Sequence, residues 1–186
     1  MTIPGVSGRS PAARVAISTL VGVALAVVLY VIGRVHTPDY TIGLFGRTGL
    51  AAISLKSLLA TVAAALAVVQ VVLALWIYGK LPGAGSAPRT VGLTHRTVGA
   101  VLVVVTLPVA IHCLLAYGVQ LSSLRVAVHS IAGCFFYGAV LAKVLFVHNK
   151  RLPGWVLPLA GGLLAVTVVL LWYTSALWYY NGYNLP

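Results

Sequence analysis

The chain has 186 residues, of which 61% are hydrophobic and 7% are charged, and its formal net charge is +11. In a soluble domain roughly a quarter of all residues are charged, so most of the surface of this protein must face lipid. We therefore expect an integral membrane protein of the all-α class, a helical bundle with five transmembrane helices, because the chain contains that many apolar runs long enough to cross a bilayer.

The charged residues argue against several functions. The cations lie mostly at the ends of the apolar runs, where Lys and Arg flank membrane spans, and they form no basic stripe, which argues against nucleic acid as a partner. Asp39 is the only acidic side chain. Paired-carboxylate hydrolysis, two-metal phosphoryl chemistry and a Ser-His-Asp triad therefore lack the acids that they require.

Residues 1–14 are predicted to form a cytoplasmic tail, and residues 15–186 a single transmembrane helical domain. The first helix, at about 15–33, has the basic start and apolar run of a signal peptide, but no small-residue cleavage site follows, so we expect it to be retained. The second helix, at about 50–78, contains Gln70, whose amide we expect to bond a neighbouring helix.

Gly and Pro residues make the stretch 79–94 a predicted loop. Pro108 predicts a bend in the third helix, because proline removes a backbone hydrogen bond. Trp and Tyr residues near the C-terminus predict an aromatic belt at the bilayer interface. The three remaining helices are expected at about 95–117, 126–148 and 155–177.

The positions of the cations set the expected orientation in the plasma membrane. Eight Lys and Arg residues fall on the side of the N-terminus and four on the opposite side, so the N-terminus is expected in the cytoplasm and the C-terminus outside. The larger group is Arg9, Arg14, Lys80, Arg89, Arg96, Lys143, Lys150 and Arg151, and the smaller is Arg34, Arg47, Lys56 and Arg125.

Four of the five histidines lie on the third and fourth helices. With these helices antiparallel, His112 and His129 fall at nearly equal depth toward the outer side, and His95 and His148 fall at the inner rim. Two neutral imidazoles on facing helices can ligate one haem iron, which suits electron transfer because no coordination position stays open. Each inner histidine is rotated by roughly 100° from the outer one on its helix, so only the outer pair is expected to face across the helix pair.

The surroundings of the histidines favour a porphyrin. The pattern H-x-x-x-G occurs as HRTVG, ending at Gly99, and as HSIAG, ending at Gly133. A glycine one turn from an axial ligand leaves room for a flat ring, although it costs about 1 kcal/mol of helix propensity. Arg125 lies one turn before His129 and is placed to meet haem propionates, and Arg96 is placed to do the same at an inner site.

Other roles for the histidines stay open. His112 and His129 can also bond between helices or hold another metal, since an ionisable group deep in a membrane span indicates a function without naming it. His95 and His148 can be ordinary interfacial residues. His36 falls in a predicted loop, where a solvated surface histidine is expected.

At HRTVG, PVAIHC, RVAVHSIAGCFFYG and LWYTSALWYY the chain resembles a family of small, uncharacterised actinobacterial membrane proteins, which are similar to transmembrane b-type cytochromes of the cytochrome b-561 and ferric reductase kind. The closer resemblance covers about residues 50–186. It implies a haem-b bundle that moves electrons, with His112, His129 and also His95 as ligands. The chain departs from the ascorbate-reducible cytochromes in having five helices instead of six, with its histidines on two helices instead of four.

These observations lead to an expected function. We expect a b-type cytochrome with bis-histidine haem b, one haem or two, that passes electrons between a quinol or a redox protein and an outer acceptor. It would be the haem-bearing component of a membrane oxidoreductase, because the chain has no flavin or dinucleotide fingerprint of its own. It would act in a homo-oligomer or a larger membrane complex. The rival is a non-redox structural or assembly subunit. Proton-coupled transport is disfavoured by the absence of membrane carboxylates.

Overall fold

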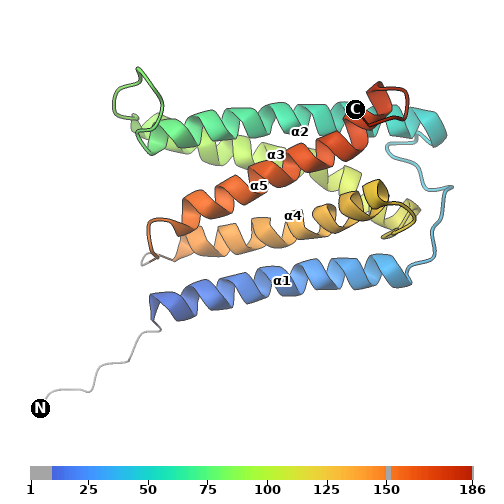
Figure 1. Cartoon of the computed structure of the whole chain (residues 1–186), viewed down its shortest axis with the longest axis horizontal. Helices are drawn as coiled ribbons and strands as arrows, with labels where there is room; N and C mark the ends of the chain where they lie inside the picture. Colours follow the sequence, from blue (N-terminus) through green and yellow to red (C-terminus); the bar gives the residue numbers. More distant parts are fainter. Residues whose placement is uncertain (1–9, 150–151, 186) are drawn as a thin grey trace, which may run out of the picture.

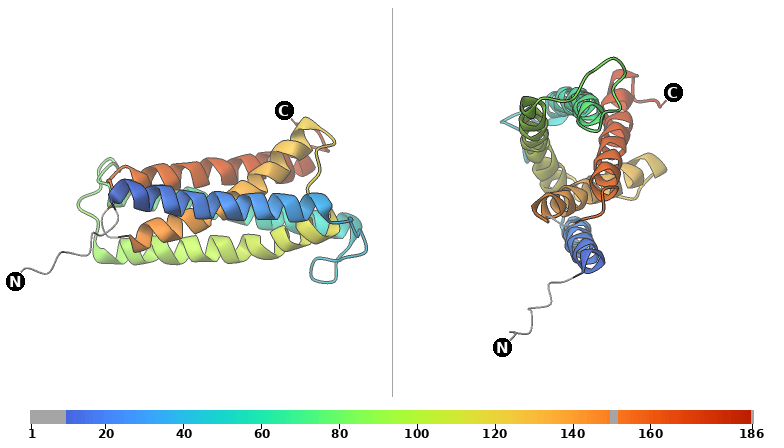
Figure 2. Two further views of the ribbon diagram at one scale, coloured as in Figure 1. Left: turned by 90° about the horizontal axis from the view of Figure 1, so that it is seen from below. Right: turned by 90° about the vertical axis from the view of Figure 1, so that its left-hand side faces the viewer.

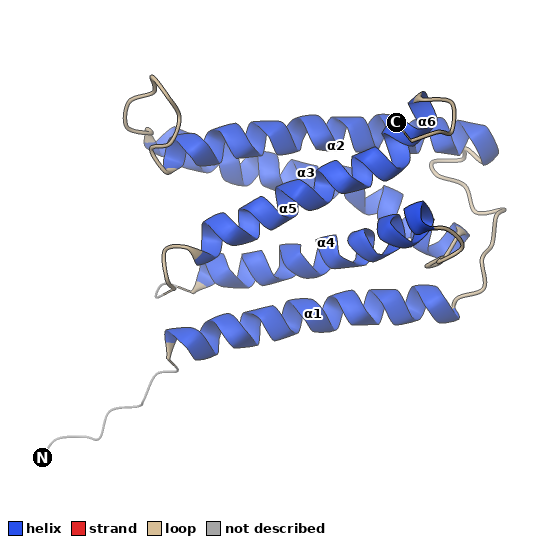
Figure 3. Ribbon diagram, in the orientation of Figure 1, coloured by secondary structure: helices blue, strands red, loops and turns tan. Residues whose placement is uncertain are grey.

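The computed structural model of the chain describes residues 10–149 and 152–185, and five long helices account for most of them (Figure 1). Within these described ranges there is no strand, so the molecule is all-α as expected (Figure 3). The helices are α1 (Pro11–Val35), α2 (Gly49–Ile77), α3 (Arg89–Ala116), α4 (Leu124–His148) and α5 (Val156–Trp172), which continues through the π-helical segment η1 (Tyr173–Leu177) into α6 (Trp178–Tyr180).

Two helices begin earlier than the sequence pattern predicts. Helix α1 begins at Pro11, because the Ser10 hydroxyl accepts a hydrogen bond from the Ala13 amide at 3.2 Å and proline fits the first turn. Most of the predicted tail 1–14 lies outside the described residues, and its last part is helical. Helix α3 begins at Arg89 with Pro88 at its N-cap position, so the end of the predicted loop is helical as well.

The packing places large apolar side chains outward and polar ones inward. Leu20, Val104 and Val166 are each more than 60% exposed, at 65%, 68% and 67%. The buried polar residues are Ser18, Ser57, His112, Thr167 and Thr174. Water would make this arrangement unfavourable, whereas lipid solvates the exposed apolar faces. All five helices are long and apolar enough to span a bilayer, which is compatible with a multi-pass membrane protein.

Helices α2 to α5 form the four corners of a bundle, and α1 lies outside it against α4 (Figure 2). The main packed pairs of this bundle are α2 with α3, α4 with α5 and α2 with α5, while α3 and α4 approach each other much less. The centre is filled by one or two residues from each corner helix. They are Ala63, Ala67, Leu102, Phe136 and Val168.

We call the two ends of the bundle the near end and the far end. The near end holds the start of α1, the connection between α2 and α3, and the start of α5. The far end holds the loop 36–48 between α1 and α2, the turn 117–123 between α3 and α4, and the C-terminal segment (Figure 1).

Small residues bring α1 and α4 into close contact. A Cβ atom added to Gly138 would overlap the Gly22 carbonyl and lie 2.9 Å from the Ala26 side chain. Helices in lipid associate through such small-residue interfaces, because lipid provides no hydrophobic drive between them. At the far end, the Val119 amide also donates to the Gly33 carbonyl at 2.8 Å.

We expect Gly138→Ala to destabilise the protein by about 1–3 kcal/mol, as overpacking does in tight contacts. The matched control is Gly162→Ala in α5, where an added Cβ atom meets nothing within 4 Å. The control should be neutral or stabilising, because alanine favours a helix over glycine by about 1 kcal/mol. Thermal unfolding in detergent measures both, and equal midpoints for the two variants would contradict the close α1–α4 contact.

Candidate functional site

Charged and imidazole side chains inside the α2–α5 bundle gather at two depths, separated by a largely apolar centre. We call the group toward the far end the far layer and the group toward the near end the near layer. The far layer consists of Lys56, His112, Tyr117, Arg125, His129 and Thr174. The near layer consists of Gln70, His95 and Lys143, together with Gly99 and Gly161.

The proton on the His129 ring is fixed by α5. Nδ1 of His129 lies 3.0 Å from the Thr174 hydroxyl, and that hydroxyl donates to the Leu170 carbonyl at 2.7 Å. A hydroxyl has one hydrogen to donate, so Nδ1 must be the N–H donor to Thr174. Nε2 of His129 therefore keeps its lone pair, and the Leu171 carbonyl also lies within hydrogen-bond reach of the ring.

The π-helical segment presents Thr174 to α4 through two atoms. Besides its hydroxyl, the Thr174 carbonyl accepts a hydrogen bond from Nη1 of Arg125 at 2.8 Å. The Arg125 guanidinium also lies 3.7 Å from the centroid of the Trp178 ring, in a cation–π contact. Arg125, expected to meet haem propionates, is thus held against the C-terminal part of α5.

His112 is bound to the loop 36–48 at the far end. Its side chain is 4% exposed, and its Nε2 lies 3.1 Å from the Ile42 carbonyl. A carbonyl only accepts, so Nε2 carries the proton and Nδ1 carries the lone pair. Nδ1 is buried and has no hydrogen-bond partner in the described ranges. Each far-layer imidazole therefore keeps a lone pair on one nitrogen, Nε2 in His129 and Nδ1 in His112.

The loop is also bonded to α3 near His112, and it is shaped by bonds of its own. His36 does not simply face solvent, because its Nε2 lies 2.7 Å from the Leu115 carbonyl of α3. The Thr41 hydroxyl and amide both donate to Asp39, and these two bonds lower the pKa of that carboxyl. The chain's one acidic side chain is thus an exposed loop residue that shapes a turn.

Lys56 of α2 links the two far-layer histidines electrostatically. Its charge acts on the rings of both His112 and His129, and its ammonium lies 4.2 Å from the centroid of the Tyr117 ring. Lys56 is half-buried beside the histidines, so the far layer contains two cations and no acid.

The two H-x-x-x-G glycines have different surroundings. A Cβ atom added to Gly133 meets nothing within 4 Å, so open space lies one turn from His129. A Cβ atom added to Gly99 would lie 3.3 Å from Nε2 of Gln70, so the space beside Gly99 is taken by α2. A small side chain would therefore meet no protein atoms at Gly133, whereas α2 fills the space at Gly99.

In the near layer, the structure does not bring the two inner histidines together. Nε2 of Gln70 donates to the His95 backbone carbonyl at 2.6 Å, which confirms the expected interhelical bond. The charged neighbour of the His95 ring is Lys143. His148 is exposed, and its Nδ1 lies 2.8 Å from the Val144 carbonyl of its own helix. Arg96 is exposed as well.

Sequence reasoning missed Thr174 as the partner of His129. The signal was the pair Thr174 and Ser175, two hydroxyls inside an otherwise apolar and aromatic run. A threonine hydroxyl in a helix can bond back to the preceding turn, so the pattern alone does not reveal a partner on another helix. The π-helical turn that orients it has no sequence signature.

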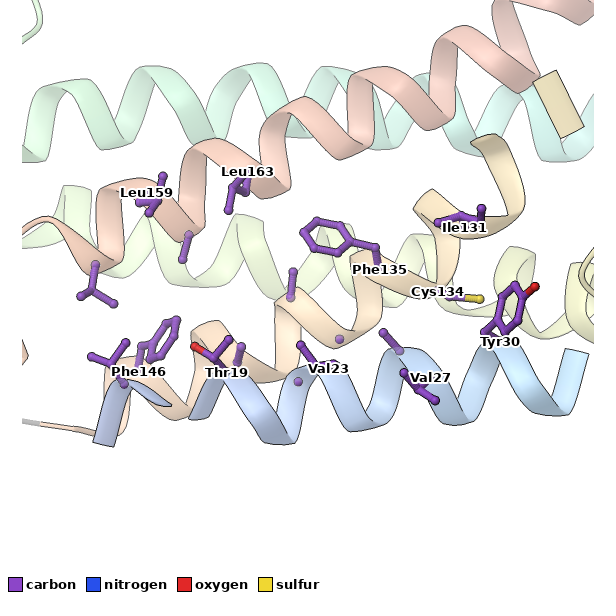
Figure 4. A pocket seen from close by; sticks show the side chains of 18 of the residues that line it. Thr19, Val23, Val27, Tyr30, Ile131, Cys134, Phe135, Phe146, Leu159 and Leu163 are labelled. Carbon is purple, nitrogen blue, oxygen red and sulfur yellow. The ribbon is translucent and has the colours of Figure 1, made fainter. Parts of the chain in front are cut away.

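Two cavities border α4 away from the histidines. An apolar groove of about 680 Å³ runs between α1, α4 and α5 (Figure 4), and a second cavity of about 390 Å³ lies between α4 and α5. Neither is lined by a histidine. In the part of the chain that the structure describes, no three His, Cys, Asp or Glu side chains converge on a metal site, so a metal would have to be held by two imidazoles.

Comparison with known proteins identifies a family. No curated protein and no solved structure matches the chain significantly. The model of a family of unknown function, DUF6529, matches residues 15–186, which include all of the helices except the first turn of α1. The chain belongs to the DUF6529 family.

Proposed function

We propose that the protein is a b-type cytochrome-like electron-transfer protein that holds haem b in the far layer, with His129 and His112 as axial ligands. The observation that carries the proposal is the fixed tautomer of His129. Histidines that ligate metals almost always donate their other N–H to an acceptor, which sets the ring orientation and raises its basicity. His129 donates Nδ1–H to Thr174, so its Nε2 keeps the lone pair that a metal needs.

Three further features of the far layer suit this cofactor. His112 also has an unpaired nitrogen, Nδ1, although ligation through its Nε2 would require the bond to the Ile42 carbonyl to break. No protein atom lies within 4 Å of a Cβ position at Gly133, one turn from His129. Lys56 and Arg125 supply positive charge where two propionates would need it. When bound, haem b supplies one-electron oxidation and reduction, and the chain supplies its ligands and its charge environment.

The proposed setting is the plasma membrane, with the near end in the cytoplasm because most Lys and Arg residues lie toward it. Electrons would come from a quinol or a redox protein, within an oxidoreductase whose other components are separate chains. One haem is proposed. His95 has no second imidazole beside it among the described residues, because His148 is bonded to its own helix.

A structural or assembly subunit is the second candidate function. It is favoured by the fact that each far-layer histidine already bonds another segment, His129 to Thr174 and His112 to Ile42. In that case the histidines would fix the helix arrangement, as polar side chains in membrane bundles do, at about 0.6 kcal/mol per bond. The spectrum of the purified protein distinguishes the two functions.

Protein purified from haem-replete cells should show sharp α and β bands and a shifted Soret band on reduction with dithionite. His129→Ala should abolish these bands while the protein elutes as a folded species in size-exclusion chromatography. His148→Ala is the control, because His148 is exposed at the near end, and it should keep the spectrum. A colourless wild-type protein, or a His129→Ala variant with the normal spectrum, would contradict the proposal.

Thr174→Val removes the acceptor of His129 with little change in shape. We expect haem to bind about 10–100-fold more weakly, as when other outer-shell partners of metal ligands are lost. Ser175→Ala is the matched control, since the Ser175 hydroxyl only bonds back to Leu171 at 2.6 Å. Titration of haem-free protein with haemin measures both affinities. Equal weakening in the two variants would show that the effect comes from the helix and not from His129.

A further inference from the structure

The apolar groove between α1, α4 and α5 runs along most of the membrane span. It extends from Val15 to Tyr30 on α1 and from Ile131 to Phe146 on α4. Each stretch corresponds to about 22 Å along a helix axis. The rim of the groove is exposed, with Val27 on α1 at 53%, so the groove opens sideways to the lipid (Figure 4).

The width of the groove indicates what kind of molecule can fill it. A volume of about 680 Å³ over a length of about 22 Å gives a mean cross-section of about 30 Å². A helix with its side chains is about 10–12 Å across, or about 80–110 Å² in section, so a helix of a second copy would not enter the groove. A methyl-branched hydrocarbon chain is about 6 Å across, because non-bonded carbons approach to about 3.5–4.0 Å. One such chain has about the section of the groove.

The lining of the groove favours a neutral occupant. No charged residue and no histidine lines it, and small side chains such as Ala26, Ala139 and Ala142 contribute to its walls. Burying a phosphate or an ammonium there without a partner would cost several kcal/mol. The part of a ligand that lies inside the groove must therefore be uncharged.

Tyr30 places a hydroxyl at the far end of the groove. Figure 4 shows its ring beside Ile131 and Cys134, with the hydroxyl directed away from α1. Among residues 10–149 and 152–185 this hydroxyl has no hydrogen-bond partner. A phenol both donates and accepts, so Tyr30 can bond a carbonyl or a hydroxyl on a neutral ring that enters the groove.

The far end of the groove lies across α4 from the far layer. Tyr30 is five residues from the end of α1 and His129 five from the start of α4, so both lie at a similar depth. Ile131 is rotated by about 200° from His129 about the axis of α4. The groove also shares Ile131 and Phe135 with the second cavity, which reaches Val128, the chain neighbour of His129. A ring beside Tyr30 would thus be separated from the far layer by one helix, about 10–12 Å in width.

We propose that the groove binds an isoprenoid quinol, with its branched tail along α1 and α4 and its ring bonded to the Tyr30 hydroxyl. Such a molecule combines a neutral oxygen-bearing ring with a methyl-branched tail, which matches the section of the groove, its uncharged lining and the hydroxyl at its far end. The inference rests on the proposed function, for which it identifies the electron donor. Oxidation of the quinol to the quinone releases two protons to water at the far end. It also releases two electrons, which would pass to haem b in two one-electron steps, with reoxidation by the acceptor between them.

The first experiment counts bound quinone. The full-length protein is reconstituted in phosphatidylcholine nanodiscs that contain a naphthoquinone with a four-isoprene tail, and the ligands that stay bound are counted by native mass spectrometry. We expect one quinone per chain in the wild type. Val27→Trp would fill the groove one turn from Tyr30 and should lower retention of the quinone at least about tenfold.

Val28→Trp is the matched control for Val27→Trp. Val28 is similarly exposed, at 51%, but it does not line the groove, so this variant should retain the quinone like the wild type. Equal retention in the two variants would overturn the proposal. So would a phospholipid retained in place of the quinone, which would assign the groove to an acyl chain. A dimer that Val27→Trp converts to a monomer would assign the groove to a second copy and would also overturn the proposal.

Tyr30→Phe tests the position of the ring. This variant keeps the apolar groove for the tail and removes only the hydroxyl, so we expect about fivefold weaker binding of the same quinone. Unchanged binding in Tyr30→Phe would exclude Tyr30 as the partner of the ring.

The haem spectrum of the same samples separates this inference from the proposed function. Quinone bound to a colourless protein would refute the proposed function and leave the groove site in place, whereas haem-loaded protein that retains no quinone would refute the groove site alone. In haem-loaded protein, added quinol should reduce haem at least about tenfold more slowly in Val27→Trp than in Val28→Trp, while dithionite reduces both fully. Equal rates would overturn the role of the bound quinol as donor.

Discussion

Lipid offers no hydrogen bonds, so every polar side chain inside this bundle must find its partner on the protein itself. The interhelical bonds follow from that constraint: Gln70 with the His95 carbonyl, Tyr137 with Thr106, and His129 with Thr174. They fix the rotation of each helix about its axis, which apolar contacts alone define poorly. Against this background, an unpaired polar atom in the interior is costly.

Two such places exist, and the apolar centre keeps them apart. Phe136 and its neighbours fill the middle of the bundle, so the far and near layers do not share polar groups. The two layers also differ in chemistry. The far layer contains two imidazoles, which suit a metal, whereas the near layer contains one imidazole and one ammonium. Neither layer contains an acidic side chain, because Asp39 is an exposed loop residue.

The sequence predicted the five spans and their order well, because the length of an apolar run decides whether it can cross a bilayer. It also placed His112 and His129 on the helices that now carry the far layer. It could not show that α3 and α4 stand apart, that the loop 36–48 folds back onto His112, or that Gln70 fills the space beside Gly99. These features depend on helix rotation and loop conformation, which one sequence does not encode in its periodicity.

The π-helical segment affects more than the position of Thr174. Immediately before it, Nε1 of Trp172 donates to the Thr61 hydroxyl of α2 at 3.1 Å, while Thr174 receives hydrogen bonds from α4. One wide turn thus connects α5 to two helices on different sides of the bundle. A rotation of α5 about its own axis would break bonds to both at once. The segment therefore fixes the position of α5 relative to both α2 and α4. It thereby sets the distance between the α2–α3 pair and the α4–α5 pair, including the width of the gap between α3 and α4.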